Sequence, residues 1–261
     1  MLLGRTAIHR PVRLPGFPGN QADRNAERLI LQQLRALGAR EVRDLGCGVG
    51  GSMAWLRSRH PARYAGLTIS AEQVRIAERQ FGGSGLQVLN GDYHRREDLL
   101  ALGGPADCVY FIESLVHSES PETAVRAAAS LLRPGGRLLV LDDFVAGAHG
   151  PPPGPGERRM VERFRDGWRI PGLRPLDQAL QEAKEAGLSL RRCLDLSGFA
   201  RPRLRVDLIA PLLRPDWVGA GTAHPALANI IGGLALRRTQ ELGLTRYCFL
   251  VFERTDPRRH D

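Results

Sequence analysis

The sequence predicts an α/β protein in which helices cover a mostly parallel β-sheet. Between residues 41 and 143, short apolar segments alternate with segments of helical periodicity. Several of the apolar segments are apolar at nearly every position, as strands are when both faces of a sheet are covered. A glycine-rich turn at residues 46–51 follows the first of them, which is typical of the passage from a strand to a ligand-facing helix.

The composition is that of a globular protein. The chain has 261 residues, 43% of them hydrophobic, which suits one α/β domain with an insertion. The net charge is +9, from 37 basic and 28 acidic residues. Lys184 is the only lysine, and the arginines are scattered over the whole chain. The charge therefore does not predict a nucleic-acid-binding surface.

The four cysteines show no C-x-x-C pair and no metal-site spacing, which suits a reducing compartment. Residues 1–12 lack an apolar signal core. The most apolar later segment, 225–236, is far shorter than the ~20 residues that span a bilayer. We therefore expect a cytoplasmic protein with no membrane partner and no bound metal.

The first half of the chain is read as follows. Residues 1–20 carry prolines and glycines without a period and predict an irregular arm. A helix with one apolar face is expected over 22–37, where Gly38 ends it. Strands and helices then alternate, with strands expected at 41–46, 63–68, 86–90, 107–112 and 137–141 and helices at 52–59, 70–81, 95–102 and 120–132.

The pattern changes after Asp143. Residues 147–156 form a proline- and glycine-rich linker that excludes helix and central strand. Beyond it, helices are expected at 157–168, 176–186, 203–213 and 223–242, and strands at 188–195 and 246–253. The final strand after a long helix favours an antiparallel end to the sheet.

The segment from Asp44 to Gly51, D-L-G-C-G-V-G-G, carries the first site motif. Its glycines let a ligand approach the backbone, and Asp44 can reach the ligand's charged end. The segment resembles the first motif of class I S-adenosylmethionine (SAM) methyltransferases. With Gly51 the segment also matches the letters of the dinucleotide-binding fingerprint. The rest of the chain must therefore distinguish a SAM site from a dinucleotide site.

The segment Gly66 to Gln73, G-L-T-I-S-A-E-Q, is similar to that of sterol and tocopherol C-methyltransferases and of cyclopropane-forming methyltransferases. The resemblance implies that this segment lines the ribose of SAM. No acid stands at the end of this strand, although many methyltransferases place one there. Ser70 and Gln73 also form a capping box, S-x-x-Q, and the two roles are compatible.

Two later loops add polar groups at the same sheet edge. After the third strand, Asp92 can accept a hydrogen bond from the adenine amine, and Tyr93 can cover the ring; a solvated turn is the alternative. After the fourth strand, a carboxylate at Glu113 can stabilise positive charge on an acceptor, and His117 can take its proton. Alternatively, His117 has a structural role and holds the loop in place by capping.

Two further motifs are read as structural. Residues 131–137 are similar to the L-x-P-G-G turn of class I methyltransferases. Asp142 and Asp143 end the fifth strand; a metal site would need a third ligand, so we expect one acid to anchor the lid.

The resemblance implies a single Rossmann-like domain with a seven-stranded mostly parallel sheet, the class I methyltransferase fold, and an α-helical lid. Its expected parts are an arm and helix (1–40), a SAM-binding core (41–143), a lid insertion (144–235) and a final helix end and strand (236–261). The expected catalytic residues are Glu113 and His117. The expected SAM-binding residues are Asp44, Gly46, Cys47, Gly48, Gly50, Thr68, Ile69, Ser70, Gln73, Gly91, Asp92, Tyr93, Ile112 and Glu113.

The predicted function is SAM-dependent methyl transfer to a small hydrophobic metabolite in specialised metabolism, with S-adenosylhomocysteine (SAH) as product. Carbon is the favoured acceptor, and nitrogen and oxygen stay open. Arginines near the apolar lid residues, Arg165, Arg169, Arg201, Arg203 and Arg205, would accommodate an acidic acceptor. The alternatives are an RNA or protein methyltransferase and a non-catalytic SAM-binding or dinucleotide-binding relative. A homodimer is compatible with the sequence; nucleic acid is not an expected partner.

Overall fold

The computed structural model describes residues 9–17, 19–147, 153–200 and 225–255. One seven-stranded sheet runs through it, in the order β3-β2-β1-β4-β5-β7-β6. The strands β1 to β5 are parallel, and β7 is antiparallel to both β5 and β6. The predicted mostly parallel sheet with an antiparallel end is confirmed. The strands are β1 (Glu41–Leu45), β2 (Arg63–Thr68), β3 (Leu86–Asn90), β4 (Ala106–Ile112), β5 (Leu132–Val145), β6 (Leu188–Asp195) and β7 (Thr245–Arg254).

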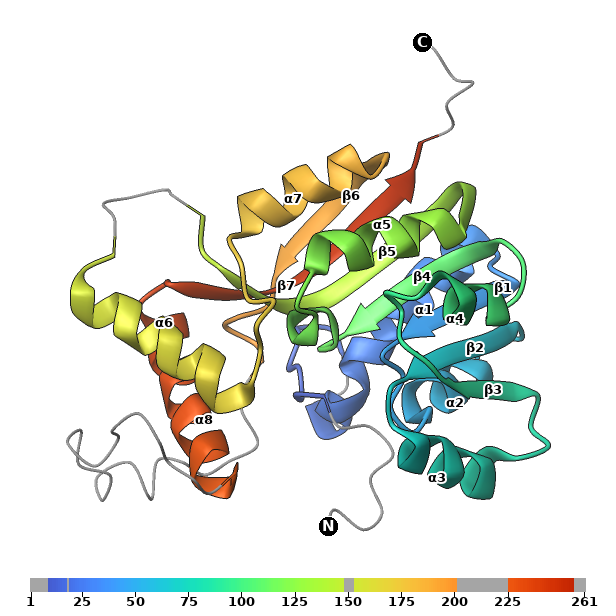
Figure 1. The fold of residues 1–261 in the computed structure, drawn as a ribbon, viewed down its shortest axis with the longest axis horizontal. Helices are drawn as coiled ribbons and strands as arrows, with labels where there is room; N and C mark the ends of the chain where they lie inside the picture. The colour runs from blue at the N-terminus through green and yellow to red at the C-terminus, as the bar shows by residue number, and fades with distance from the viewer. Residues whose placement is uncertain (1–8, 18, 148–152, 201–224, 256–261) are drawn as a thin grey trace.

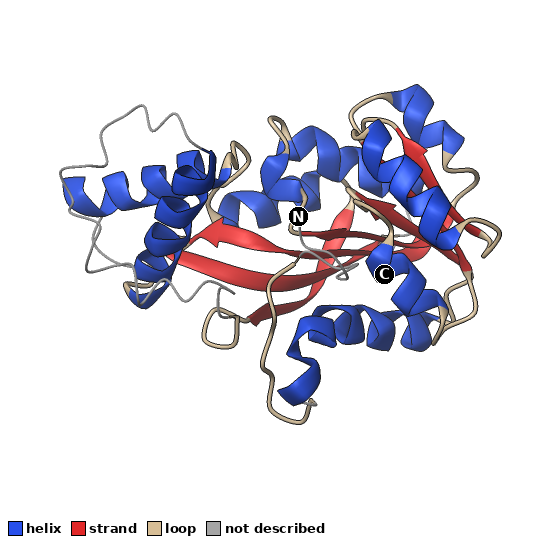
Figure 2. Ribbon diagram, turned by 90° about the horizontal axis from the view of Figure 1, so that it is seen from below, coloured by secondary structure: helices blue, strands red, loops and turns tan. Residues whose placement is uncertain are grey.

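Helices cover both faces of the sheet (Figures 1 and 2). One core cluster joins the sheet to α1 (Asn25–Leu37) and α2 (Gly51–Arg57). The other joins it to α4 (Arg96–Ala101), α5 (Pro121–Leu131) and α7 (Leu176–Glu185). The remaining helix beside the sheet, α3 (Ala71–Phe81), contacts β2 and β3. Because both faces are covered, the central strands are buried along their length, as their sequences predicted.

The local signals in the sequence explain most helix ends. Gly38 closes α1 with a left-handed φ of 57°, and its N–H bonds back to the helix. The Ser70 side chain accepts from the Gln73 N–H and begins α3, so the predicted capping role of Ser70 is confirmed. Pro121 occupies the first turn of α5, where its missing N–H costs nothing.

Two helices form a separate layer beyond the sheet. The helices α6 (Pro155–Trp168) and α8 (Pro225–Glu241) pack on each other and share a third apolar cluster with Val116. Gly167 and Gly232 mark their closest approach, since a Cβ added to Gly167 would lie 2.6 Å from the Cα of Gly232. We call α6 and α8 the lid helices.

The segment 144–235, expected to form a lid, does not all lie with the lid helices. The helix α7 covers the sheet, and β6 pairs with β7 as part of it. The expected boundary at 235 also falls inside α8, which is continuous. The expected helix at 203–213 lies outside the described residues. No helix in the described part of the chain is long and apolar enough to cross a membrane.

Candidate active site

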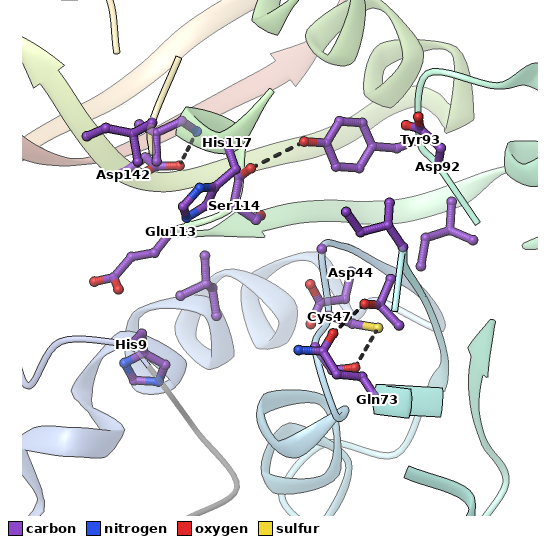
Figure 3. Close-up of a pocket in the computed structure, with 18 of the residues that line it drawn as sticks. His9, Asp44, Cys47, Gln73, Asp92, Tyr93, Glu113, Ser114, His117 and Asp142 are labelled. Atoms are coloured by element: carbon purple, nitrogen blue, oxygen red, sulfur yellow. Dashed lines mark hydrogen bonds between the residues drawn. The ribbon is translucent and has the colours of Figure 1, made fainter. Parts of the chain in front are cut away.

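A cavity of about 830 Å³ opens at the carboxyl ends of β1, β2 and β4, where ligands of parallel sheets bind (Figure 3). It extends from the glycine-rich turn to Trp168, the last residue of α6, and to Ile170 just after that helix. Of the predicted site residues, those that line it are Asp44, Gly46, Cys47, Gly48, Thr68, Ile69, Gln73, Gly91, Asp92, Tyr93, Ile112, Glu113 and His117.

Gly50 and Ser70 do not line the cavity, so their predicted contact with a ligand is not supported. A Cβ on Gly50 would meet Val88 at 3.0 Å, on the side of the core. Gly50 instead occupies the N-cap of α2 with φ 78°, a conformation that glycine adopts without strain. Ser70 caps α3.

The turn after β1 has the geometry of a ligand cradle. Gly46 has φ 93°, and a Cβ there would lie 2.4 Å from the Cβ of Ser114, so no other residue fits. Gly48 has φ 56°, and the nearest atom to an added Cβ is the Gln73 amide nitrogen at 4.0 Å. The backbone of this turn is therefore open to a ligand on the Gly48 side.

Asp44 is a buried carboxylate at the base of this cradle. It is 3% exposed, and within the described residues it forms no ion pair. Burial raises the pKa of Asp44 to about 7. A carboxylate in this state is stabilised by any cation that a ligand brings, such as an ammonium group. Asp44 therefore fits the amino-acid end of SAM.

Behind the cradle, Glu27 on α1 joins three parts of the chain. Its Oε1 lies 2.8 Å from the Nε2 of His9 and accepts from Arg24 at 2.9 Å and from the Ser52 hydroxyl at 3.2 Å. Glu27 is fully buried. The irregular arm thus connects to the first helical turn after the glycines.

The end of β2 carries polar groups where many methyltransferases have an acid. The Thr68 hydroxyl donates to the Gln73 amide oxygen, which leaves the Gln73 NH₂ free to donate toward the cavity. Ile69 beside them is 79% exposed. Hydroxyl and amide groups can bind ribose hydroxyls, and an exposed apolar side chain can cover a base, so the segment fits a nucleoside.

Asp92 is less free than the sequence suggested. Its Oδ1 accepts from the backbone N–H of His94 at 2.9 Å and lies 2.7 Å from the His94 Nδ1. The other ring nitrogen of His94 lies 2.8 Å from the Ser118 hydroxyl. His94 therefore bridges the loops after β3 and β4, and only the second oxygen of Asp92 can meet adenine.

Tyr93 fastens the same two loops. Its hydroxyl donates to the Ser114 carbonyl oxygen at 3.3 Å, and its ring meets Phe111 edge-on. Tyr93 thus forms a fixed wall of the cavity, and its covering of adenine stays a prediction.

Glu113 differs from the expected catalytic carboxylate. It has φ 49°, an uncommon conformation for a residue other than glycine. Its Oε1 accepts from the backbone N–H and the Nε of Arg10, both at 3.0 Å, and from the Tyr247 hydroxyl at 2.8 Å. Burial raises the pKa of Glu113, but the charges of Arg10 and His9, together with the hydrogen bonds from Arg10 and Tyr247, hold the pKa below its usual value. A carboxylate held this way is a poor proton acceptor.

His117 has the geometry of a base. It is exposed, and its Nδ1 donates to the Arg169 carbonyl oxygen at 3.1 Å. In a neutral imidazole the other nitrogen, Nε2, then carries the lone pair. The other expected catalytic residue, Glu113, is placed differently, because its carboxylate extends toward His9 (Figure 3).

The acid pair at the end of β5 anchors two segments, neither of them a lid helix. Asp142 accepts from the N–H groups of Leu115 and Val116 at 2.9 and 3.1 Å. Asp143 pairs with Arg10. Within the described residues, no group of three or more His, Cys, Asp or Glu side chains is arranged to hold a metal ion.

Of the residues expected on the acceptor side, apolar ones line the cavity and two of the arginines do not. Trp168 and Ile170 line the cavity, whereas Arg165 and Arg169 do not. The expected Arg201, Arg203 and Arg205 lie outside the described residues. Sequence reasoning missed His9 and Arg10, which stand in an arm without periodicity. His94 was missed too, although its position two residues after Asp92 was a usable signal.

Comparison with known proteins shows what the chain is similar to. Residues 43–140 match the model described as a methyltransferase domain. The O-methyltransferase resE of Aspergillus sclerotiorum is 28% identical over 172 residues, 65% of this chain and 62% of that protein. The 24-methylenesterol C-methyltransferase 2 of Oryza sativa subsp. japonica is 27% identical over 195 residues, 73% of this chain and 53% of that protein.

A solved structure shows the same fold. The geranyl diphosphate C-methyltransferase from Streptomyces coelicolor A3(2), in complex with Mg²⁺, geranyl diphosphate and SAH, has a TM-score of 0.67 at 16% identity, covering 95% of this chain and 91% of that chain. The chain spans less than two thirds of the length of the two curated relatives. The predicted resemblance to class I SAM methyltransferases and the predicted fold are confirmed.

Proposed function

We propose that this chain, whose residues 43–140 match a methyltransferase-domain model, is a SAM-dependent methyltransferase that acts on a hydroxyl group of a small, largely apolar molecule. The observation that carries the choice of oxygen is the orientation of His117. Its Nδ1 is committed to the Arg169 carbonyl, so its Nε2 is the proton acceptor. An uncharged hydroxyl needs such a base, because it must lose its proton as it receives a methyl group.

The described residues fit SAM along its whole length. Asp44 would hold the ammonium group, and the Gly46–Gly48 backbone would hold the amino-acid end. Thr68 and Gln73 would hold the ribose hydroxyls. Ile69 and Asp92 would hold the adenine. When bound, SAM supplies an electrophilic methyl group on a sulfonium.

The chain's own contribution is to position the acceptor, exclude water and remove a proton. Trp168 and Ile170 of the lid side provide an apolar wall. His117 takes the hydroxyl proton at Nε2 and donates from Nδ1 in both protonation states, so its contact with Arg169 survives the transfer. General-base catalysis of this kind contributes about a hundredfold to ten-thousandfold to the rate.

Carbon methylation is the second candidate, and the sequence favoured it. It is supported by the resemblance of residues 66–73 and by the relative named 24-methylenesterol C-methyltransferase 2. A carbon acceptor that becomes cationic would be stabilised by a free carboxylate. The commitment of Glu113 to Arg10 and Tyr247 weakens this candidate relative to oxygen.

The test has two steps. Calorimetry with SAM, SAH and NAD should show binding of the first two alone; binding of NAD alone would identify a dinucleotide-binding relative. Labelled SAM is then incubated with a panel of phenols, alcohols and alkenes, and the site of methylation is read by mass spectrometry. Methyl ethers as products support the proposal, and products methylated on carbon contradict it.

Three further predictions of the sequence stay predictions: a homodimer, a cytoplasmic location and a role in specialised metabolism. Light scattering of the purified protein measures the first. We propose no nucleic-acid partner, because the site lies in a cavity bordered by the lid side and its lining is acidic.

A further inference from the structure

Arg10, a residue of the N-terminal arm, stands at the centre of a buried charge cluster. Its backbone N–H and its Nε donate to Glu113, and its Nη2 donates to Asp143. Its guanidinium lies 3.9 Å from the centre of the Tyr247 ring and 5.7 Å from that of Trp168. Arg10 is 5% exposed. One arm residue thus joins the loop after β4 to β5, β7 and α6.

The charges of this cluster nearly balance. Among the described residues that line the cavity, Arg10 is the only arginine or lysine. Its direct partners are the carboxylates of Glu113 and Asp143, and Asp142 follows beside them. Without Arg10, the buried carboxylate of Asp143 and the half-buried one of Glu113 would face the cavity with no permanent cation near them. With Arg10, the three groups carry one net negative charge when both acids are ionised.

The net charge of Arg10, Glu113 and Asp143 affects methyl transfer. The positive charge of a sulfonium spreads toward the acceptor in the transition state, so a negative group near it stabilises the bound donor more than the transition state. Binding energy of that kind makes the donor bind tightly without speeding the reaction. A guanidinium paired with these carboxylates limits this effect.

We propose that Arg10 is a positioning residue that sets the electrostatic potential at the sulfonium, acting through Glu113 and Asp143. The inference rests on the proposed function, because it takes SAM as the ligand of the cavity. Nothing in the arm's sequence marks Arg10 for this role; it follows from the contacts alone.

The affinities of SAM and SAH measure this potential without any knowledge of the acceptor. The two ligands differ by one methyl group and one positive charge, so the ratio of their dissociation constants reports the field at the sulfur. We expect Arg10→Gln to increase the preference for SAM over SAH by at least about tenfold relative to wild type, as a unit charge lost nearby in a protein interior would do. Arg10→Lys, which keeps the charge, should recover most of the wild-type ratio.

The matched control is Arg13→Gln. Arg13 belongs to the same arm and its side chain is exposed, while its backbone N–H bonds to the Phe199 carbonyl. This variant should keep the wild-type ratio. Circular dichroism of each variant reports whether it folds.

Glu113→Gln provides the opposite change if Arg10→Gln does not fold. It removes a negative charge and leaves Arg10 in place, so the preference should shift about tenfold toward SAH. In the double variant Arg10→Gln/Glu113→Gln the ratio should return toward wild type. A ratio within twofold of wild type in folded Arg10→Gln, or in folded Glu113→Gln, would overturn the inference. Failure of the wild-type protein to bind either ligand would instead overturn the proposed function.

Discussion

The Nδ1 of His117 lies 3.1 Å from the carbonyl oxygen of Arg169, directly after lid helix α6. A second tie lies beside it, since the Gly172 N–H donates to the Val116 carbonyl oxygen at 2.8 Å. The candidate base and the segment after the lid helix are therefore fastened together. A change at position 117 can act on the proton transfer, on the lid, or on both.

Two substitutions of His117 separate these effects. Asparagine places an N–H near the position of Nδ1 and has no base at the position of Nε2. We expect His117→Asn to lower turnover about a hundredfold to ten-thousandfold while SAM binding stays near wild type. His117→Ala should lower turnover as much and also speed hydrogen exchange in residues 169–173. Turnover within a few-fold of wild type in both variants would show that His117 is not the base.

Gly48→Val tests the cradle. A branched side chain at φ 56° is strained, and it would stand where a ligand approaches the backbone. We expect SAM binding to be lost. Gly83→Val is the matched control, because Gly83 has φ 76° with no atom within 4 Å of an added Cβ. It carries a similar backbone strain on an exposed turn and should bind SAM normally; equal SAM affinity in both variants would contradict the cradle.

The raised pKa of Asp44 predicts a pH dependence of ligand binding. Only the ionised carboxylate pairs with an ammonium group, and in the free protein Asp44 is protonated below its pKa of about 7. SAM affinity, measured by calorimetry, should therefore rise between pH 6 and pH 8, with proton release on binding. Asp44→Asn should bind more weakly and without this rise. An unchanged pH dependence in that variant would assign the proton to Asp142, with a pKa of about 8, or Asp143, with a pKa of about 6.

The raised pKa of Asp44 also affects the stability of the ligand-free protein. Asp44 in the unfolded chain loses its proton near 3.8, and in the folded protein near 7. Between these values the folded state binds more protons, so its stability falls as pH rises. Asp44→Asn should remove this loss, so that its melting temperature exceeds that of wild type at pH 8 and approaches it near pH 4. A lower melting temperature than wild type at pH 8 would mean that the ionised Asp44 is already stabilised in the free protein.

Gly232→Ala tests the contact between the lid helices. A Cβ at this position would lie 2.4 Å from the Cδ1 of Trp168, which requires the helices to separate. We expect a loss of about 1–3 kcal/mol of stability and a lower turnover, with SAM affinity unchanged. Gly233→Ala has no atom within 4 Å and should stabilise α8 by up to about 1 kcal/mol. Similar melting temperatures for the two variants would contradict tight packing at Gly232.

The fold was predictable from local signals because most of its elements carry their own. The strands at 63–68, 86–90 and 188–195 were predicted to the residue, since turn residues or a helix flank each one. The fifth strand was predicted too short. The Pro134–Gly136 turn was expected to precede this strand. In the structure β5 starts at Leu132, and it pairs with β4 both before and after the turn.

The site was predictable only where a motif lies at the end of a strand. Asp44, Thr68 and Glu113 follow that rule and line the cavity. Arg10 contacts Asp143 across 133 positions, and no local period marks such a contact. The pairing of Glu113 was not predictable for the same reason, since its partners Arg10 and Tyr247 come from opposite ends of the described chain.

The place of β7 in the sheet has a consequence for synthesis. In the sheet of the described residues, β6 pairs with β7 alone, yet β7 is made after it. A ribosome therefore completes Arg10 and β6 well before Tyr247, the residue that both stacks on Arg10 and donates to Glu113. Contacts so distant in sequence close slowly, and nascent chains expose unpaired edges in the meantime. A chain stopped before Thr245 would accordingly lack Tyr247, the partner of both Arg10 and Glu113, and β6 would be left as an unpaired strand open to aggregation.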